Sequence, residues 1–542
     1  MTTVTREPVA VLGSPIDPDR LTLDAILAGA LRDRPVTVLG LARSGIALAR
    51  FLSSAGAKVT IYDRRTAVEL QRAIAAVGGE GGSGASDGVR LVIGPDADPT
   101  EAWVGADLVT SSPSINPDFP TTEPRLRAAL ADLIARRRAG DRSLPAVVWE
   151  PDLFLRLCPA PTIGITGTKG KTTTAALTHA ILASDPAHPA ILGGNIGVPL
   201  VERLPELRTS DRVVFELSEL QLPTLSRGTT VAVYTNVTAD HLDRHGSLEA
   251  YQRVKRRLAE LVDPRGAIVL NDDDPVVSGY GVGSHAPVVP YRFGPAPSGG
   301  LGVVDGWIVA NGVSSLRFAG DAAPEPFSGR ILPVDELGIP GRHNVSNALA
   351  AVASGLLFGL EPDRIRAAAA AFRGVEHRLE TVAISDGIRY VNDSQGTQPD
   401  AVAAALRAFE PPIVLIAGGR AKGLDLSALA PIVAERAAAA VLIGESAPDL
   451  ARLFGAAGLG RIERAASLEA AVDQATAIAR EVARPTSKRA PIASSEPRAT
   501  VLLSPAAASF DMFIDYEERG RAFKAAVQAR LDRRAPSDGS GR

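Results

Sequence analysis

Residues 161–174 constrain the fold more than any other part of this 542-residue chain. They read Pro-Thr-Ile-Gly-Ile-Thr-Gly-Thr-Lys-Gly-Lys-Thr-Thr-Thr, an apolar strand that turns through glycines into the start of a helix. The backbone N–H groups of such a turn, together with the N-terminus of the helix, point at an anion. The pattern therefore predicts a phosphate-binding loop, in which Lys171 reaches the terminal phosphates of a nucleotide and the Thr172 hydroxyl binds Mg²⁺.

The loop has a compact form, Gly-Thr-x-Gly-Lys-Thr, because Ile165 stands where the general pattern G-x-x-x-x-G-K-[ST] has glycine. The residues expected to surround the phosphates are Gly167, Thr168, Lys169, Gly170, Lys171, Thr172 and Thr173. A glycine- and threonine-rich loop that holds no ligand is the alternative interpretation, and the strand-loop-helix context argues against it.

Composition bounds the possible partners. The length allows two to four domains, and a formal net charge of −3 with a pI near 6.2 offers no basic surface for nucleic acid or for anionic membranes. The sequence shows no apolar run long enough to span a bilayer or to act as a secretory signal near Met1. The single cysteine, Cys158, cannot form an internal disulfide. We therefore expect a cytoplasmic protein with small-molecule partners.

Strands rich in valine and isoleucine alternate with Ala/Leu-rich helices along most of the chain, which predicts α/β domains with mainly parallel sheets. The expected domains are residues 1–149, with 1–34 as an extension, 150–374 and 375–542. The first and last are expected to be Rossmann-like, and the central one contains the phosphate-binding loop. In the last domain, residues 484–498 are expected to form a flexible insertion and 533–542 a disordered tail.

The first domain has a weak nucleotide-binding pattern. A glycine turn at 40–45 follows its first strand, and the next strand ends at Asp63, about twenty residues after the turn, where an acidic residue can meet a ribose hydroxyl or a base. Ser112 lies in another polar turn that could face a ligand. The glycine spacing is looser than the dinucleotide fingerprint, so a structural Rossmann-like domain without a ligand stays open.

The central domain carries candidate metal ligands. An apolar strand delivers Glu216 and Ser218 at its carboxyl end, where open α/β sheets bind ligands. A later strand leads into a polar cluster of Asp240, His241, Asp243 and His245. These residue types can bind a cation, although a capping and hydrogen-bonding cluster is the alternative. Lys255, on the following helix, could simply belong to a solvated basic face.

Further motifs follow the phosphate-binding loop in order along the chain. They are 193–197 (GGNIG), 216–221 (ELSELQ), 236–245 (NVTADHLDRH), 341–347 (GRHNVSN), 377–378 (HR), 392–394 (NDS) and 503–513 (LSPAAASFDMF). With the compact loop, these motifs resemble the Mur ligases, enzymes that join an amino acid to a carboxylate through an acyl phosphate. The resemblance implies an ATP-dependent ligase that adds D-glutamate to UDP-N-acetylmuramoyl-L-alanine in peptidoglycan precursor synthesis.

The resemblance also implies a catalytic centre. Lys255 would be carbamylated, so that its amine becomes a carboxylate-like metal ligand. The implied metal ligands, for two Mg²⁺ ions that accompany ATP, are Thr172, Glu216, His241 and carbamylated Lys255. The implied catalytic residues are Lys171, Lys255, His241 and Arg378.

Three binding sets follow from the same resemblance. Beyond the loop, the ATP set is Asn344, Asn347, Arg378 and Asp393. The UDP-substrate set is Leu41, Ala42, Arg43, Ser44, Asp63, Arg64, Ser112, Asn195, Ser218 and Gln221. The amino-acid set is Thr397, Lys422, Ser509 and Tyr516. We expect a monomer.

Two positions depart from the family pattern. Gln395 replaces a lysine in Asn-Asp-Ser-Lys-Ala-Thr, which removes one cation near the substrates, and Ser114 replaces a common glycine. One alternative is therefore a ligase that adds L-glutamate to the same nucleotide. A folylpolyglutamate synthetase-like ligase is another, but its loop lies near the N-terminus, whereas here a whole domain precedes Gly167. A non-catalytic nucleotide-binding protein would have no physical reason to keep Lys171, Glu216, His241 and Lys255 together.

Overall fold

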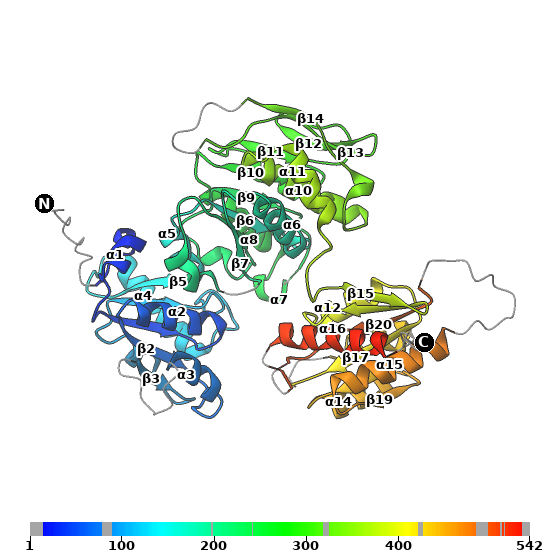
Figure 1. The fold of residues 1–542 in the computed structure, drawn as a ribbon. Helices are drawn as coiled ribbons and strands as arrows, with labels where there is room; N and C mark the ends of the chain where they lie inside the picture. The colour runs from blue at the N-terminus through cyan, green and yellow to red at the C-terminus, as the bar shows by residue number, and fades with distance from the viewer. Residues whose placement is uncertain are drawn as a thin grey trace, which may run out of the picture. The chain divides into compact units, whose positions relative to one another are not determined.

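The computed structural model describes residues 15–78, 89–196, 199–240, 242–317, 325–420, 426–483, 497–509, 512–513 and 515–533. The chain divides into two compact units, Met1–Arg373 and Gly374–Arg542, and carries three sheets (Figure 1). The predicted α/β class with mainly parallel sheets is confirmed. Among the described helices, none is long and apolar enough to cross a membrane. Most of the predicted insertion (484–496) and tail (534–542) lies outside the described residues.

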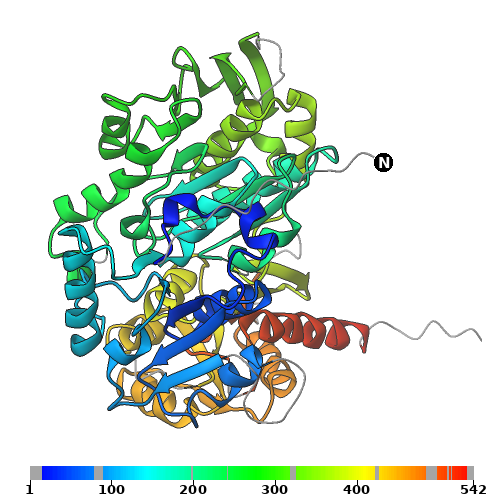
Figure 2. The ribbon, with the colours of Figure 1, turned by 90° about the vertical axis from the view of Figure 1, so that its left-hand side faces the viewer.

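The first sheet has the order β3-β2-β1-β4-β5, and every pairing among these strands is parallel. Its first strands are drawn in blue in Figure 2. Its elements are η1 Pro18–Arg20, α1 Leu23–Leu27, β1 Pro35–Leu39, α2 Arg43–Ser54, β2 Lys58–Asp63, α3 Gln71–Val77, β3 Val89–Ile93, η2 Pro99–Ala102, β4 Leu108–Ser111, α4 Pro124–Arg138 and β5 Ala146–Trp149. The central strands β1 and β4 are almost wholly buried, as expected for parallel strands covered on both faces.

The second sheet has nine strands in the order β14-β13-β12-β11-β10-β9-β6-β8-β7. Its elements are α5 Glu150–Leu157, β6 Thr162–Thr166, α6 Lys171–Ala183, β7 Ala190–Gly194, η3 Leu200–Glu206, β8 Arg212–Glu216, η4 Leu222–Thr224, β9 Val231–Tyr234, α7 Leu242–His245, α8 Leu248–Leu261, β10 Ala267–Asn271, α9 Pro275–Ser278, η5 Gly279–Gly281, β11 Val288–Tyr291, β12 Gly300–Val304, β13 Trp307–Val313, β14 Phe327–Pro333, η6 Val334–Glu336, α10 Arg342–Leu357 and α11 Pro362–Ala371. Strands β12 to β14 pair antiparallel, and the remaining pairs are parallel. The phosphate-binding loop follows β6, in the parallel part.

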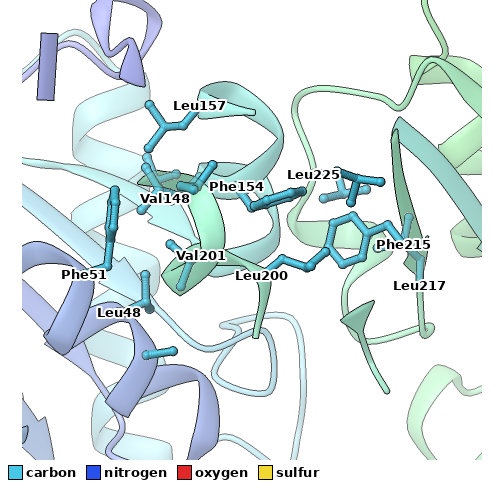
Figure 3. Close-up of a cluster of buried hydrophobic side chains, with 14 of the residues drawn as sticks. Leu48, Phe51, Val148, Phe154, Leu157, Leu200, Val201, Phe215, Leu217 and Leu225 are labelled. Carbon is cyan, nitrogen blue, oxygen red and sulfur yellow. The ribbon is translucent and has the colours of Figure 1, made fainter. Parts of the chain in front are cut away.

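The first two sheets share one continuous core, which explains why they form a single unit. Figure 3 shows Leu48 and Phe51 of α2, Phe154 of α5, Val201 of η3 and Phe215 of β8 within it. The rings of Phe154 and Phe215 meet edge to face with their centroids 5.5 Å apart. The amino-terminal segment joins this core through buried apolar side chains, which are Ile16, Leu21, Leu23, Ile26 and Leu31.

The unit Gly374–Arg542 contains a sheet of six strands in the order β15-β16-β20-β17-β18-β19. Its elements are β15 Glu380–Ser385, β16 Ile388–Asn392, α12 Pro399–Arg407, β17 Ile413–Gly418, α13 Ala430–Arg436, β18 Ala437–Ile443, α14 Ala447–Ala456, β19 Ile462–Arg464, α15 Leu468–Val482, β20 Ala499–Leu503 and α16 Tyr516–Asp532. Among the described strands of this sheet, only β15 pairs antiparallel, so the Rossmann-like character predicted for this block is confirmed.

Candidate active site

The phosphate-binding loop connects β6 to α6 through two glycines that other residues could not replace easily. Gly167 has φ +146°, and Gly170, which caps α6, has φ +86°. A Cβ at Gly167 would lie 2.0 Å from Thr235 Oγ1, and one at Gly170 would lie 2.4 Å from Asn347 Oδ1. The loop therefore needs glycine both for its backbone conformation and for its close packing.

The loop is held by residues that follow β9. The backbone N–H of Thr168 donates to the Asn236 carbonyl over 2.7 Å, and the N–H of Lys169 donates to Asn236 Oδ1 over 3.0 Å. The Thr235 hydroxyl donates to the Lys169 carbonyl over 2.6 Å. The sequence analysis assigned no role to Thr235 or Asn236, although Asn236 opens one of its motifs. These hydrogen bonds fix the backbone of the loop against the end of β9.

The first residues of α6 have the chemistry of an anion site. Lys171 Nζ lies over its own loop and donates to the Thr168 carbonyl over 2.8 Å. Thr172 is buried, and the first-turn N–H groups of α6 lack intrahelical partners, as at every helix start. Lys171 and the helix N-terminus together favour negative charge at this point. Thr173 is the next residue of the same first turn.

Both asparagines of the predicted ATP set lie on α10 beside this loop. Asn347 accepts a hydrogen bond from the Thr174 hydroxyl over 3.3 Å and donates to Asn344 Oδ1 over 3.2 Å. Asn344 Nδ2 donates in turn to the Pro340 carbonyl over 2.7 Å. Asn347 thus joins α10 to α6, and Asn344 lies at the exposed start of α10.

Gly170→Ala should destabilise the central domain more than Gly283→Ala. The two glycines have φ +86° and +76°, so either substitution costs about 1 kcal/mol in backbone strain. The new Cβ at Gly170 would also meet Asn347 Oδ1 at 2.4 Å, whereas no described atom lies within 4 Å of one at Gly283. We expect a further loss of roughly 1–2 kcal/mol at Gly170, visible as a lower calorimetric unfolding midpoint. Equal midpoints would contradict this close packing.

Lys255 lies fully buried on α8 instead of on a solvated face. Its Nζ donates to Thr166 Oγ1, at the end of β6, over 3.2 Å and lies 5.5 Å from the centre of the Tyr251 ring. Tyr251, Lys255 and Leu258 are all buried, and their spacing puts them on one helix face. That spacing was the signal in the sequence that Lys255 points inward.

The surroundings of Lys255 favour its neutral form. Burial, with a smaller effect from the positive charge of Lys171, lowers the pKa of Lys255 to about 7. Nearby carboxylates oppose this without offsetting the burial; they are Glu219, Glu216 and Asp240. A substantial fraction of Lys255 is therefore an uncharged amine at neutral pH.

Glu216 ends β8 with one carboxylate oxygen engaged and one free. Its Oε1 accepts a hydrogen bond from Asn195 Nδ2 over 3.0 Å, while the buried Oε2 has no hydrogen-bond partner among the described residues. A buried carboxylate oxygen without a partner is costly unless a cation or a water meets it. Glu216 therefore suits a hard cation such as Mg²⁺, for which carboxylate oxygens are preferred ligands.

The polar cluster after β9 is only partly described. His241 and the side chain of Asp243 lie outside the described residues. The ring of His245 packs 5.4 Å from the Tyr251 ring and 6.4 Å, edge-on, from the Phe119 ring. Within the described ranges, no three His, Cys, Asp or Glu side chains converge on a common point.

The turn after β1 is organised by Asp63, at the end of β2. Asp63 Oδ2 accepts the N–H of Leu41 over 2.8 Å, and Arg65 binds both carboxylate oxygens. Burial alone would raise the pKa of Asp63, but the hydrogen bonds from Arg65 and Leu41 outweigh it and hold the pKa below its usual value. The predicted Arg64 is exposed, and Arg65, which was not among the predicted residues, is the arginine that contacts Asp63.

Other members of the UDP-substrate set lie nearby in the same unit. Ala42 caps α2, and the helix begins with Arg43 and Ser44. The guanidinium of Arg43 donates to the Asn195 carbonyl over 3.3 Å, which links the first sheet to the residue that contacts Glu216. Of the remaining members, Ser218 donates its hydroxyl to Gln221 Oε1 over 3.1 Å, and Ser112 pairs with Ser114, outside the set, over 3.0 Å.

Arg378, in the unit Gly374–Arg542, lies between two residues with positive φ. Its neighbours His377 and Leu379 both have left-handed conformations, with φ +63° and +46°. Asp393 is buried and accepts the Ser504 hydroxyl over 2.6 Å and the Leu379 N–H over 3.2 Å. Burial raises the pKa of Asp393 to about 6, although the bond from Ser504 opposes the rise. Strained backbone of this kind is typical of functional sites.

Three members of the predicted amino-acid set, Thr397, Ser509 and Tyr516, lie in the segments that follow β16 and β20. Ser394 Oγ donates to the Tyr516 carbonyl over 2.7 Å, and the fully buried Arg519 binds both Ser394 and the Ala507 carbonyl. Ser509 is buried two residues further along. Thr397 lies after Gln395 in the first segment, and Lys422 lies outside the described residues. Sequence reasoning missed Arg519, since one arginine on a helix carries no signal of burial.

The chain matches two family models. Residues 165–355 match the Mur ligase middle domain, and residues 377–484 match the Mur ligase glutamate ligase domain. Among curated relatives, the UDP-N-acetylmuramoylalanine--D-glutamate ligase of Symbiobacterium thermophilum is 37% identical over 93% of this chain and 100% of the relative. The enzyme of the same name from Pelotomaculum thermopropionicum is 37% identical over 91% of this chain and 97% of the relative.

A solved structure also aligns along the chain. It is the UDP-N-acetylmuramate-alanine ligase MurC of Thermotoga maritima, with a TM-score of 0.48, 18% identity, and coverage of 92% of this chain and 99% of that chain.

Proposed function

The chain belongs to the Mur ligase family, and on that premise we propose that it is an ATP-dependent ligase that adds D-glutamate to UDP-N-acetylmuramoyl-L-alanine in peptidoglycan precursor synthesis. Curated relatives with that activity in their names align over nearly their whole length. The observation that carries the proposal is the clustering of three features in the central domain. The phosphate-binding loop, the unpartnered Oε2 of Glu216 and the buried amine of Lys255 lie at one end of the central sheet.

The reaction explains why such a site needs positive charge. A carboxylate and an amine do not condense in water, so the substrate carboxylate first attacks the γ-phosphate of ATP, which forms an acyl phosphate and releases ADP. The neutral amine of the amino acid then attacks the acyl carbon, and phosphate leaves. Lys171 and the N-terminus of α6 would offset the repulsion between the carboxylate and the phosphates in the first step. No protein nucleophile is required.

Mg²⁺ fits the donors that the chain presents. Glu216 Oε2 and the Thr172 hydroxyl would hold it, together with His241 and carbamylated Lys255, and two ions are proposed. The metal would supply charge stabilisation for the transferring phosphoryl group. Asn195 contributes by orienting Glu216, because its amide occupies Oε1 and leaves Oε2 for the ion.

The environment of Lys255 supports its carbamylation. An amine reacts with carbon dioxide only when it is unprotonated; the new N–C bond yields a carbamate, and one proton is released. Burial lowers the pKa of Lys255 to about 7, so the reactive form is well populated at neutral pH. The Thr166 hydroxyl, 3.2 Å from Nζ, would hold the group toward Glu216 and the loop.

Each domain is proposed to hold one substrate. Residues 1–149 would bind the UDP moiety, with Leu41, Ala42, Arg43 and Ser44 at the start of α2 facing the diphosphate. Residues 150–374 would bind ATP. Residues 375–542 would bind glutamate through Thr397, Lys422, Ser509 and Tyr516, and would supply Arg378 and Asp393 to ATP. We propose that the enzyme works as a cytoplasmic monomer.

Phosphate release from ATP tests the proposal most directly. The purified chain is incubated with Mg²⁺, ATP and UDP-N-acetylmuramoyl-L-alanine, and D-glutamate, L-glutamate and no amino acid are compared. We expect release with D-glutamate alone, which would show that Gln395 is compatible with D-glutamate in place of the usual lysine. Release with L-glutamate alone would mean that the amino-acid domain has changed its specificity, and no release with either would overturn the proposed function.

A further inference from the structure

Glu150 is a buried acid that the proposed catalytic centre does not use. It is the first residue of α5, where the chain passes from β5 of the first sheet into the central domain, and it is 4% exposed. The elements α2 and α5 both pack on η3 in this region, and the apolar part of their contact is drawn in Figure 3. A carboxyl group in such a place needs a partner, because burying an unpaired charge is costly.

Two groups stabilise the ionised form of Glu150. The backbone N–H of Val201, on η3, donates to its carboxylate, and the guanidinium of Arg43, at the start of α2, provides the opposing charge. The same guanidinium donates to the Asn195 carbonyl over 3.3 Å. Arg43 therefore acts electrostatically on Glu150 while it is hydrogen-bonded to the residue that orients Glu216.

The other charged groups on the packed elements have partners of their own. Asp152 of α5 pairs with Arg156 over 2.8 Å, and Glu202 of η3 pairs with Arg50 of α2 over 3.5 Å. Burial raises the pKa of Glu150 to about 7, although Arg43 and the Val201 N–H oppose the rise. The charge of Glu150 thus depends on where Arg43 points.

We propose that Glu150 is a positioning residue that holds Arg43 toward Asn195 until the nucleotide substrate binds, and that Glu150 takes up one proton from solvent when it does. The inference rests on the proposed function, since it takes the diphosphate of the substrate as the anion at the turn before α2. That anion draws Arg43 away from Glu150 and adds negative charge near it. Both effects favour the neutral carboxyl group.

Proton uptake makes nucleotide binding depend on pH. The pKa of Glu150 is about 7 in the free protein and higher in the bound protein. Binding is therefore strongest below about pH 7, where Glu150 is protonated in both states. Above that value the affinity falls as pH rises, by at most about tenfold per pH unit, until Glu150 is ionised in both states. The main-chain carbonyl of Asn195 would lose its bond from Arg43 at the same moment, while the side-chain amide stays on Glu216.

Isothermal titration calorimetry of the full chain with UDP-N-acetylmuramoyl-L-alanine tests this inference. At about pH 8, binding enthalpies measured in buffers of different ionisation enthalpy report the number of protons taken up. We expect the wild type to take up nearly one proton per nucleotide bound. Glu150→Gln should lack this uptake, and Glu202→Gln should take up as many protons as the wild type. Equal uptake in the wild type and Glu150→Gln would overturn the role of Glu150.

A second measurement covers the case in which Glu150→Gln does not fold. The dissociation constant of the wild-type complex should rise between about pH 7 and pH 9, and a constant value would count against the inference just as clearly. Absence of nucleotide binding at every pH would instead contradict the proposed function.

Discussion

Lys255→Met should abolish turnover and at the same time stabilise the fold. Methionine has similar length and needs no partner in an apolar environment, whereas the buried amine must lose its proton or remain charged without water. We expect a turnover loss of at least about 10³-fold, because a proposed metal ligand is removed. We also expect the free energy of unfolding at pH 7 to rise by roughly 1–4 kcal/mol.

The pH dependence of stability identifies the cause. The pKa of Lys255 is about 7 in the folded chain and near 10.5 when unfolded, so the unfolded chain binds more protons between these values. Wild-type stability should therefore gain from Lys255 as pH rises through that window, and the methionine variant should lack this gain. The measurement is denaturant unfolding at several pH values without bicarbonate. Identical pH profiles for the two proteins would show that Lys255 is not held neutral by burial.

Lys255→Ala separates the proposed carbamate from the lysine itself. The alanine variant should recover part of its turnover when a short carboxylate such as formate or acetate is added, because the acid can fill the vacated space as a metal ligand. Arg253→Ala, which changes an exposed residue on the same helix, should retain full turnover and show no response to the acid. Full turnover of Lys255→Ala without any acid would refute the proposed role.

Glu216→Gln should lower turnover by about 10²–10⁴-fold and raise the Mg²⁺ concentration needed for half-maximal activity. The amide can still meet Asn195, but it no longer places a charged oxygen at the position of the unpartnered Oε2. Phosphate release measured against Mg²⁺ concentration reports both effects. Stability should change little or rise, since the charge of a buried carboxylate with one unpartnered oxygen is removed.

Asp211→Asn is the matched control for Glu216. Asp211 is buried immediately before β8, at the opposite end of the strand from Glu216, and accepts the N–H of Arg208 over 2.9 Å. Its amide variant should leave the Mg²⁺ dependence unchanged. An unaltered Mg²⁺ dependence in Glu216→Gln would remove Glu216 from the proposed metal site.

The phosphate-binding loop was predictable because its geometry is local. A strand, two glycines with positive φ and a helix beginning at Lys171 are encoded within residues 161–174, and the structure forms them there. The parallel sheets were predictable for a similar reason, since the alternation of Val/Ile strands with Ala/Leu helices already requires them. The resemblance to the Mur ligases supplied the individual roles, which local patterns could not.

The contacts across sheets could not be read from the sequence. The N–H of Leu41 reaches Asp63 only because β1 and β2 are neighbours in the sheet. Arg519 binds Ser394, which lies more than a hundred residues earlier in the chain, and the Ala507 carbonyl. Glu150 carried no signal at all, because its burial arises where α2, α5 and η3 meet. Such contacts depend on which elements become neighbours, and side-chain periodicity does not report that.

By itself, the sequence determined the α/β class, the phosphate-binding loop and the order of the motifs along the chain. Only the tertiary structure decided that Lys255 is buried against Thr166 and Tyr251, that Glu216 keeps one oxygen without a partner, and that Arg43 reaches Asn195. The physical reason is the range of the interactions. Backbone conformation follows from nearby residues, whereas burial and charge pairing depend on side chains brought together from distant parts of the chain.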